Sequence, residues 1–197
     1  SIAVPMMQAM SASDATMLCR VPWLEAGIIM KLLDAGAMGI ICPMINSREE
    51  AEEFVGATLY SPDGYRSSGP VRANIIHSDY HNSANDQIIS LAMIETEQAV
   101  ENAEAMAALD GIDALLFGTS DLTIEMGIPG QMGHPRVVKH YETAAAACPR
   151  QRQRGTPPIH PARAAAQAGR TQRARSRRRS PVASPCLLYT SDAADDT

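Results

Sequence analysis

The strongest constraint on the fold is an alternation of short apolar runs with amphipathic segments. The apolar runs are residues 15–22, 39–44, 87–95 and 114–121. Short runs that are apolar almost throughout are typical of strands in parallel sheets, because such strands are buried on both faces. Strands that alternate with helices characterise α/β folds. We therefore predict a parallel sheet that is either covered by helices on both faces or closed into a barrel.

The segments between the runs have the pattern of helices. Residues 24–34 place large apolar side chains on one helical face, and residues 47–58 begin with a serine and a glutamate in capping-box spacing. Residues 97–109 form the third predicted helix. The longer connection at residues 59–86 contains two turn-forming sequences instead.

The net charge of -5 combines two segments of opposite charge. Residues 1–148 carry 7 Lys and Arg against 19 Asp and Glu, a net charge of -12, whereas residues 149–197 carry 10 against 3, a net charge of +7. Residues 149–184 are rich in Arg, Ala, Pro and Gln and have neither helical nor strand periodicity. Because such a composition is typical of disorder, we predict a folded domain at residues 1–148 and a disordered tail at residues 149–197.

Several classes of protein are disfavoured by the sequence. No apolar run approaches the roughly 20 residues that cross a bilayer, and the first residues lack the pattern of a secretory signal. The cysteines Cys19, Cys42, Cys148 and Cys186 are far apart and form no zinc or redox motif. The basic tail is accompanied by no folded nucleic-acid-reading module. We expect a soluble cytoplasmic protein without membrane or nucleic-acid partners.

Charged side chains stand at the ends of three predicted strands. Glu95 ends the third apolar run, Asp121 ends the fourth, and Arg20 lies near the end of the first. The carboxyl ends of parallel strands share one face of the fold, where active sites form. Two carboxylates in a partly apolar cleft are costly unless a cation neutralises them, and hard divalent metals prefer oxygen ligands. The pair predicts a metal site, and Arg20 can hold a substrate carboxylate or oxo group. Alternatively, both acids simply favour the helix N-termini that follow them.

Five motifs extend this interpretation. They are RVPW at residues 20–23, GIICPMIN at 39–46, GYRSSGPVRA at 64–73, MIET at 93–96 and GTSDL at 118–122. In order and in approximate spacing they resemble motifs of the HpcH/HpaI aldolase/citrate lyase family, and the resemblance covers residues 2–148. It implies a (β/α)8 TIM barrel of the pyruvate aldolase type, incomplete here, with about four central β/α units. It also implies a homo-oligomer, a hexamer, for the full-length protein.

The resemblance assigns roles to residues of this chain. It implies that Glu95 and Asp121 bind a divalent metal, which is Mg²⁺, Mn²⁺ or Co²⁺. It implies that Arg20 is the catalytic cation, which contacts the oxo acid and stabilises the enolate. The turn from Gly118 to Asp121 is expected to present backbone N–H groups, those of Ser120 and Asp121, to the pyruvate carboxylate.

The implied reaction is metal-dependent aldol chemistry on small molecules. A 2-oxo acid chelates the metal, loses a methyl proton and adds as an enolate to an aldehyde, or a 4-hydroxy-2-oxo acid is cleaved in the reverse direction to release pyruvate. One alternative is a citrate-lyase-β-like or malyl-CoA-lyase-like acyl-CoA lyase, although the RVPW and GTSDL contexts fit pyruvate aldolases better. Another alternative is an inactive partial protein.

The sequence also departs from the family. Family members begin with two further strand–helix units, and the second carries a histidine for proton transfer that we expect to lie before this chain begins. We therefore assign no general base to the five histidines, which are His77, His81, His134, His140 and His160. Arg66 and Arg72 lie in the long connection, and either a turn-forming role or assistance to an anionic substrate is open for that segment.

The tail departs from the family as well. It resembles GC-rich DNA translated in a wrong reading frame, and residues 186–195 resemble a translated sequencing adapter. We expect the tail to supply neither of the last two barrel strands and to make few long-range contacts. A barrel that lacks half of its strands exposes sheet edges, so we expect the chain to be poorly soluble and inactive by itself.

Overall fold

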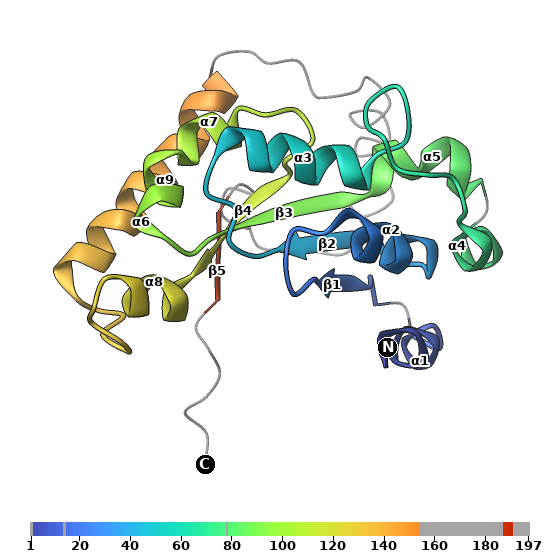
Figure 1. The fold of residues 1–197 in the computed structure, drawn as a ribbon, viewed down its shortest axis with the longest axis horizontal. Coiled ribbons are helices and arrows are strands. Elements are labelled where there is room, and N and C mark those ends of the chain that lie inside the picture. The colour runs from blue at the N-terminus through green and yellow to red at the C-terminus, as the bar shows by residue number, and fades with distance from the viewer. Residues whose placement is uncertain (1, 14, 78, 154–186, 191–197) are drawn as a thin grey trace, which may run out of the picture.

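The computed structural model describes residues 2–13, 15–77, 79–153 and 187–190, and for residues 149–153 and 187–190 it describes the backbone. Five parallel strands form one sheet in the order β1-β2-β3-β4-β5 (Figure 1). The strands are β1 (Leu18–Arg20), β2 (Gly39–Cys42), β3 (Ile89–Ile94), β4 (Ala114–Gly118) and β5 (Leu187–Thr190). The predicted parallel α/β sheet is confirmed.

Nine helices are present in the described ranges. They are α1 (Ala3–Met10), α2 (Ala26–Asp34), α3 (Arg48–Thr58), α4 (Val71–Ile76), α5 (Tyr80–Gln87), α6 (Glu97–Glu101), α7 (Ala103–Ala107), α8 (Thr119–Glu125) and α9 (Pro135–Gln153). Among these described segments, no helix combines the length and the hydropathy of a membrane span.

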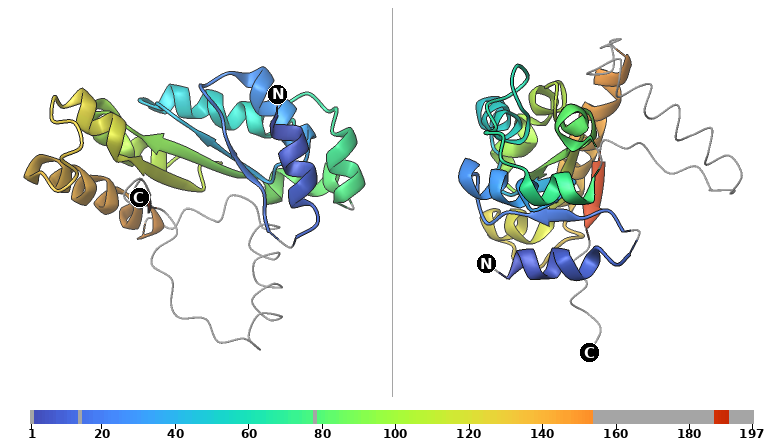
Figure 2. Two further views of the ribbon diagram at one scale, coloured as in Figure 1. Left: turned by 90° about the horizontal axis from the view of Figure 1, so that it is seen from below. Right: turned by 90° about the vertical axis from the view of Figure 1, so that its right-hand side faces the viewer.

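The order of the strands distinguishes a barrel from a doubly wound sheet. From β1 to β4, each strand pairs with the next strand of the chain. Because parallel crossovers are right-handed, this order places the connecting helices on one side of the sheet, and α2, α3 and α7 lie there together (Figures 1 and 2). The chain therefore has four consecutive units of a (β/α)8 barrel, as its sequence predicts.

The two faces of the sheet have different neighbours. Side chains of alternate residues point to opposite faces of a strand. Ala92 and Ile94 of β3 belong to the main hydrophobic core with the residues of α2 and α3, whereas Leu91 and Met93 are buried outside that core. Glu95 lies an even number of positions after Leu91 and Met93. Its side chain therefore projects to the same face as theirs, opposite the helices. In a closed barrel that face is the interior.

The observed element bounds differ from the predicted ones at several points. The fourth predicted strand, residues 114–121, ends at Gly118, and α8 begins at the next residue. The predicted helix at 97–109 is divided at Asn102, whose side-chain amide donates to the Gln98 carbonyl. The connection at 59–86 contains α4 and most of α5 and is more regular than its turn sequences suggest.

The residues after Cys148 also contain more regular backbone than predicted. Helix α9 continues to Gln153, and β5 pairs with β4 along four residues, from Leu187 to Thr190. The expectation that the tail supplies no strand is wrong for this segment. Strand β4 offers an edge of backbone N–H and C=O groups, and Tyr and Thr favour extended backbone. The division at residue 148 and the origin of the tail stay predictions.

Candidate active site

Glu95 is the central residue of the candidate site. It follows β3 directly and is only 1% exposed. Its Oε2 accepts a hydrogen bond from the Met44 N–H at 2.8 Å, whereas its buried Oε1 has no hydrogen-bond partner among the described residues. Burial raises the pKa of Glu95, the Met44 N–H lowers it, and the neighbouring Asp121 carboxylate raises it again. The site therefore holds a carboxylate that lacks a partner for one oxygen.

Gly118 makes room for this carboxylate. A Cβ atom at Gly118 would lie 2.5 Å from both Cγ and Oε1 of Glu95. Such distances are shorter than any real contact, so a larger residue would displace the Glu95 side chain. Oε1 consequently faces the carboxyl end of β4, which is the point at which α8 begins.

Asp121 lies near Glu95 but on a different element from the one predicted. The sequence places it at the end of a strand, whereas it lies in the first turn of α8, three residues after the N-cap Gly118. Its side chain is exposed, and its charge contributes to the raised pKa of Glu95. The Thr-Ser-Asp sequence at residues 119–121 contains residues that favour helix starts, and this signal was available in the sequence.

Arg20 ends β1 with an exposed side chain. Its positive charge lowers the pKa values of both Cys42 and Glu95, so it faces the carboxyl ends of β2 and β3. Burial nevertheless raises the pKa of Cys42 to about 12, and this thiol therefore stays protonated near neutral pH. The three charged residues that the sequence singled out, Arg20, Glu95 and Asp121, share one end of the sheet.

The two carboxylates fit a hard divalent metal. Glu95 contributes a buried oxygen without a partner, and Asp121 adds a second carboxylate beside it. No group of three or more His, Cys, Asp or Glu side chains suited to a metal occurs in the described part of the chain. Substrate oxygens and water would have to complete the coordination sphere, which suits Mg²⁺ and Mn²⁺ because such ions keep several waters.

Met44 is a site residue that the sequence analysis missed. It lies in the loop between β2 and α3 with a φ of 55°, in the left-handed region that side chains other than glycine rarely adopt. This conformation directs its N–H to Glu95. Nothing in the sequence around Pro43 and Met44 indicates it.

Arg66 and Arg72 are remote from this site. The Arg66 side chain is fully buried, where Nη2 donates to Asp34 Oδ1 at 2.7 Å and Nη1 donates to the Tyr80 hydroxyl at 3.1 Å. Arg72 donates to the Ala35 carbonyl. Asp34 and Ala35 precede β2, so both arginines lie at the amino ends of the strands. Of the two roles left open for the connection, these contacts support a structural one.

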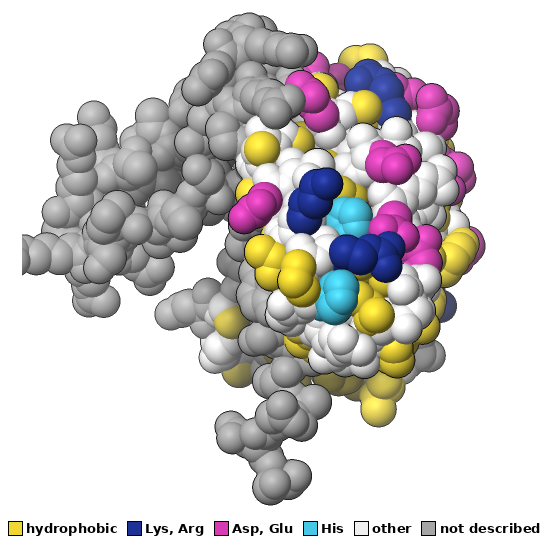
Figure 3. Space-filling model, turned by 90° about the vertical axis from the view of Figure 1, so that its left-hand side faces the viewer, with side chains coloured by type: hydrophobic (Ala, Val, Ile, Leu, Met, Phe, Trp, Pro, Cys, Tyr) yellow, Lys and Arg dark blue, Asp and Glu magenta, His cyan; other side chains and the backbone are white. Residues whose placement is uncertain are grey.

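The described histidines also lack contacts with the carboxylate pair. His140 Nε2 lies 3.1 Å from Glu97 Oε1, and Arg136 Nη2 donates to the same oxygen at 3.0 Å. Figure 3 shows the molecule from the left-hand side of Figure 1, which is the side towards which β3 runs. Acidic, basic and histidine side chains are interspersed on this face. His77 and His81 pack against tyrosine rings. His160 lies outside the described residues.

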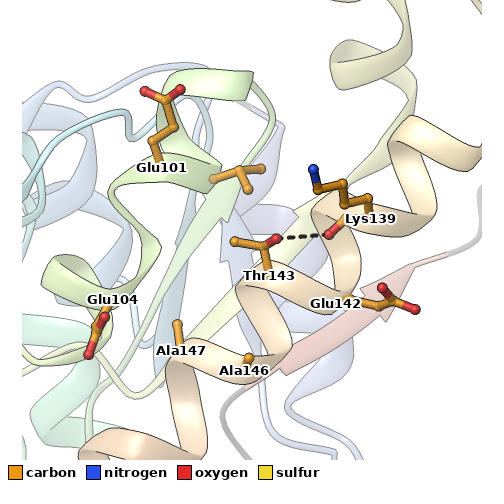
Figure 4. A pocket seen from close by; sticks show the side chains of 8 residues that line it. Glu101, Glu104, Lys139, Glu142, Thr143, Ala146 and Ala147 are labelled. Carbon is orange, nitrogen blue, oxygen red and sulfur yellow. Dashed lines mark hydrogen bonds between the residues drawn. The ribbon is translucent and has the colours of Figure 1, made fainter.

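A separate hollow of about 400 Å³ lies between the α6–α7 segment and α9 (Figure 4). It is lined by Val100, Glu101, Glu104, Lys139, Glu142, Thr143, Ala146 and Ala147. The Thr143 hydroxyl donates to the Lys139 carbonyl within α9. None of the candidate site residues lines this hollow, so the site and the hollow are distinct.

Comparison with known proteins identifies the family of this chain. Residues 1–156 match the family model of the HpcH/HpaI aldolase/citrate lyase family. A hydroxypyruvate/pyruvate aldolase of Rhizorhabdus wittichii is 42% identical over 124 residues, which cover 62% of this chain and 49% of that protein. A 5-keto-4-deoxy-D-glucarate aldolase of Escherichia coli is 38% identical over 139 residues, which cover 69% of this chain and 54% of that protein.

The solved structures give the same result. The HpcH/HpaI aldolase of Desulfitobacterium hafniense superposes with a TM-score of 0.72 at 28% identity, covering 97% of this chain and 71% of that one. The chain spans about half the length of the curated relatives that it matches. With the family model matched over most of its residues, the chain belongs to the HpcH/HpaI aldolase/citrate lyase family.

Proposed function

We propose that the protein to which this chain belongs is a metal-dependent aldolase that uses pyruvate as its enolate component. The observation that carries the proposal is the buried Glu95 carboxylate, which has one oxygen without a partner and a second carboxylate, Asp121, beside it. The relatives named above are aldolases. The substrates in this proposal are a 2-oxo acid and an aldehyde, or the 4-hydroxy-2-oxo acid that joins them.

Glu95 and Asp121 would hold the divalent metal. A bound Mg²⁺, Mn²⁺ or Co²⁺ supplies Lewis-acid polarisation of the 2-oxo acid, which makes loss of its methyl proton feasible. The Met44 N–H keeps one oxygen of Glu95 in place, so the carboxylate needs little reorganisation when a ligand arrives. Gly118 keeps the space beside Oε1 open.

Arg20 has the role of stabilising negative charge on the oxo oxygen. Its exposed guanidinium extends from the end of β1 and already acts electrostatically on Glu95. A planar fork of N–H donors can contact a carboxylate and an enolate oxygen together, and a fixed cation stabilises charge where it develops. Arg20 would therefore lower the barrier to proton removal without itself moving a proton.

The start of α8 would orient the substrate carboxylate. Helix α8 follows Gly118, and the backbone N–H groups of Ser120 and Asp121 belong to its first turn. N–H groups of a first helical turn point away from the helix and suit an anion. The general base stays unassigned, because no described histidine contacts Glu95 or Asp121.

Two measurements test the proposal. The 197-residue chain should bind Mn²⁺, and Glu95→Gln and Asp121→Asn should each abolish this binding because each removes one anionic ligand. In a protein completed at both ends around residues 2–148, the same substitutions should abolish release of pyruvate from a 4-hydroxy-2-oxo acid, followed with lactate dehydrogenase. Unchanged metal affinity and pyruvate release in either variant would show that the site is wrongly assigned. Release of free CoA thiol from an acyl-CoA substrate, without pyruvate, would instead favour the acyl-CoA lyase alternative.

A further inference from the structure

We propose that Asn46 positions Glu95 for metal binding by closing a ring of hydrogen bonds around its carboxylate. The inference rests on the metal site proposed above, but it concerns a residue that would touch neither metal nor substrate. Asn46 lies in the loop between β2 and α3, two residues after the left-handed Met44.

The ring has four members. Glu95 Oε2 accepts from the Met44 N–H at 2.8 Å, and the Met44 carbonyl accepts from Asn46 Nδ2 at 2.9 Å. Asn46 Oδ1 accepts from the Thr96 hydroxyl at 2.5 Å. Thr96 follows Glu95 in the chain, so the ring returns to its starting residue. The Asn46 side-chain amide thus bonds to Met44, the donor residue of the Met44–Glu95 hydrogen bond, and to Thr96, which follows the acceptor residue.

The donors and acceptors allow only one orientation of this amide. The Met44 carbonyl can only accept, so the NH2 group of Asn46 must face it. The Thr96 hydroxyl already accepts from the Ala99 N–H at 3.0 Å, as the N-cap of α6, and its own proton is therefore available to Asn46 Oδ1. Neither an aspartate nor an apolar side chain at position 46 reproduces both bonds.

The backbone of Asn46 is fixed from two sides. Its N–H donates to Glu50 Oε2 at 2.6 Å, and its carbonyl accepts from Asn102 Nδ2 at 2.8 Å. Helix α3 and the α6–α7 junction therefore anchor the residue that holds Met44. This anchoring is needed because the left-handed conformation of Met44 is unfavourable by itself for a residue other than glycine. Without the amide, Met44 can relax and its N–H turns away from Glu95.

The ring determines which oxygen of Glu95 is available to a ligand. Oε2 is occupied by Met44, and Oε1 faces Gly118 without a partner. Substitutions of groups that orient a metal ligand typically weaken metal affinity about 10-fold to 100-fold. Asn46 is therefore a positioning residue, and its loss should weaken metal affinity while leaving both carboxylates present.

The first test measures the Mn²⁺ dissociation constant of the 197-residue chain from the electron paramagnetic resonance signal of free Mn²⁺. Asn46→Ala should weaken binding about 10-fold or more. Asn82→Ala is the matched control: it removes another side-chain amide, which donates to Asp79 Oδ1 at the start of α5, and leaves the ring and its anchors intact. It should change the affinity less than twofold. A parent-like affinity in Asn46→Ala overturns the inference.

Asn46→Asp separates position from charge. An added carboxylate near the site attracts a cation and would by itself tighten Mn²⁺ binding. The aspartate cannot donate to the Met44 carbonyl, so a positioning role predicts weaker binding despite the added charge. Tighter binding in this variant overturns the inference, and the variant is also available if Asn46→Ala does not fold.

A second readout needs no metal. Amide hydrogen exchange at Met44 should be slow in the parent chain and at least 10-fold faster in Asn46→Ala and Asn46→Asp. In Asn82→Ala it should be as slow as in the parent. If the parent binds no Mn²⁺, the proposed metal site is wrong, yet Met44 exchange still decides the role of Asn46. Equal Met44 protection in the parent and in both Asn46 variants refutes the ring as a positioning device.

Discussion

The substitution Gly118→Ala adds one methyl group beside Glu95 and so tests the geometry of the site. The new Cβ would lie 2.5 Å from Cγ and Oε1 of Glu95 and 2.9 Å from its Cδ. Favourable contacts between carbon atoms begin at about 3.5 Å, so the Glu95 side chain must retreat by about 1 Å. A movement of that size breaks its 2.8 Å bond with the Met44 N–H. Loss of a hydrogen bond to a charged group costs about 1.5–3 kcal/mol, and overpacking adds about 1–3 kcal/mol.

The backbone itself does not oppose this substitution. Gly118 has a φ of -100° and a ψ of 92°, which alanine adopts readily. The steric strain of Gly118→Ala therefore arises from the contact with Glu95. We expect the free energy of unfolding in urea to fall by about 2–5 kcal/mol and Mn²⁺ affinity to fall at least about 10-fold, since a displaced ligand binds poorly.

Two further variants make the test specific. Gly56→Ala is a control, because its Cβ would meet the half-exposed Tyr65 ring, which can rotate into solvent. It should leave Mn²⁺ affinity unchanged. The double variant Gly118→Ala/Glu95→Asp shortens the displaced side chain, so its loss of stability should be smaller than the sum of the two single losses. Parent-like stability and affinity in Gly118→Ala would refute the proposed contact between these two residues.

Three other predictions concern single residues. Arg20→Lys keeps the charge but loses the planar fork, so kcat/KM for pyruvate release in a completed protein should fall about 100-fold; a parent-like rate would make Arg20 structural. Burial raises the pKa of Cys42 to about 12, so a thiol reagent at pH 8 should leave Cys42 unmodified until urea unfolds the chain. Peptide mass spectrometry can measure this modification, and rapid labelling of the native chain would contradict the prediction. Arg66→Met leaves Asp34 without its partner and should lower the free energy of unfolding by roughly 2–4 kcal/mol. The Mn²⁺ affinity should be unchanged, and weaker Mn²⁺ binding would connect Arg66 to the site.

The elements that the sequence predicts well are those with a strong local pattern. The run at residues 89–94 is apolar except for Ser90, and the largely buried strand β3 forms there. Ser47 caps α3, and the Glu50 N–H donates to its hydroxyl, as the capping pattern indicates. The position of Glu95 after a buried strand follows from the same pattern, because a charged residue ends an apolar run.

The parts that the sequence does not predict depend on contacts between distant residues. The Glu95 side chain bonds to Met44, which is 51 positions away, and the left-handed φ of Met44 has no local signal. The end of β4 was misplaced because Thr119 and Ser120 are compatible with either a strand or a helix start. Arg66 looked like a possible substrate contact because nothing local reveals its burial or its distant partner Asp34.

The separation of Arg66 and Arg72 from Glu95 has a consequence for laboratory evolution. The two arginines fasten the long connection at the amino ends of the strands, whereas the candidate chemistry lies at the carboxyl ends. Substitutions around the arginines can be selected for thermal tolerance. In an independent library, substitutions around Arg20 and Glu95 can be selected for a changed substrate preference in the proposed reaction. Gains from the two libraries should combine nearly additively, because residues far apart without shared partners rarely interfere.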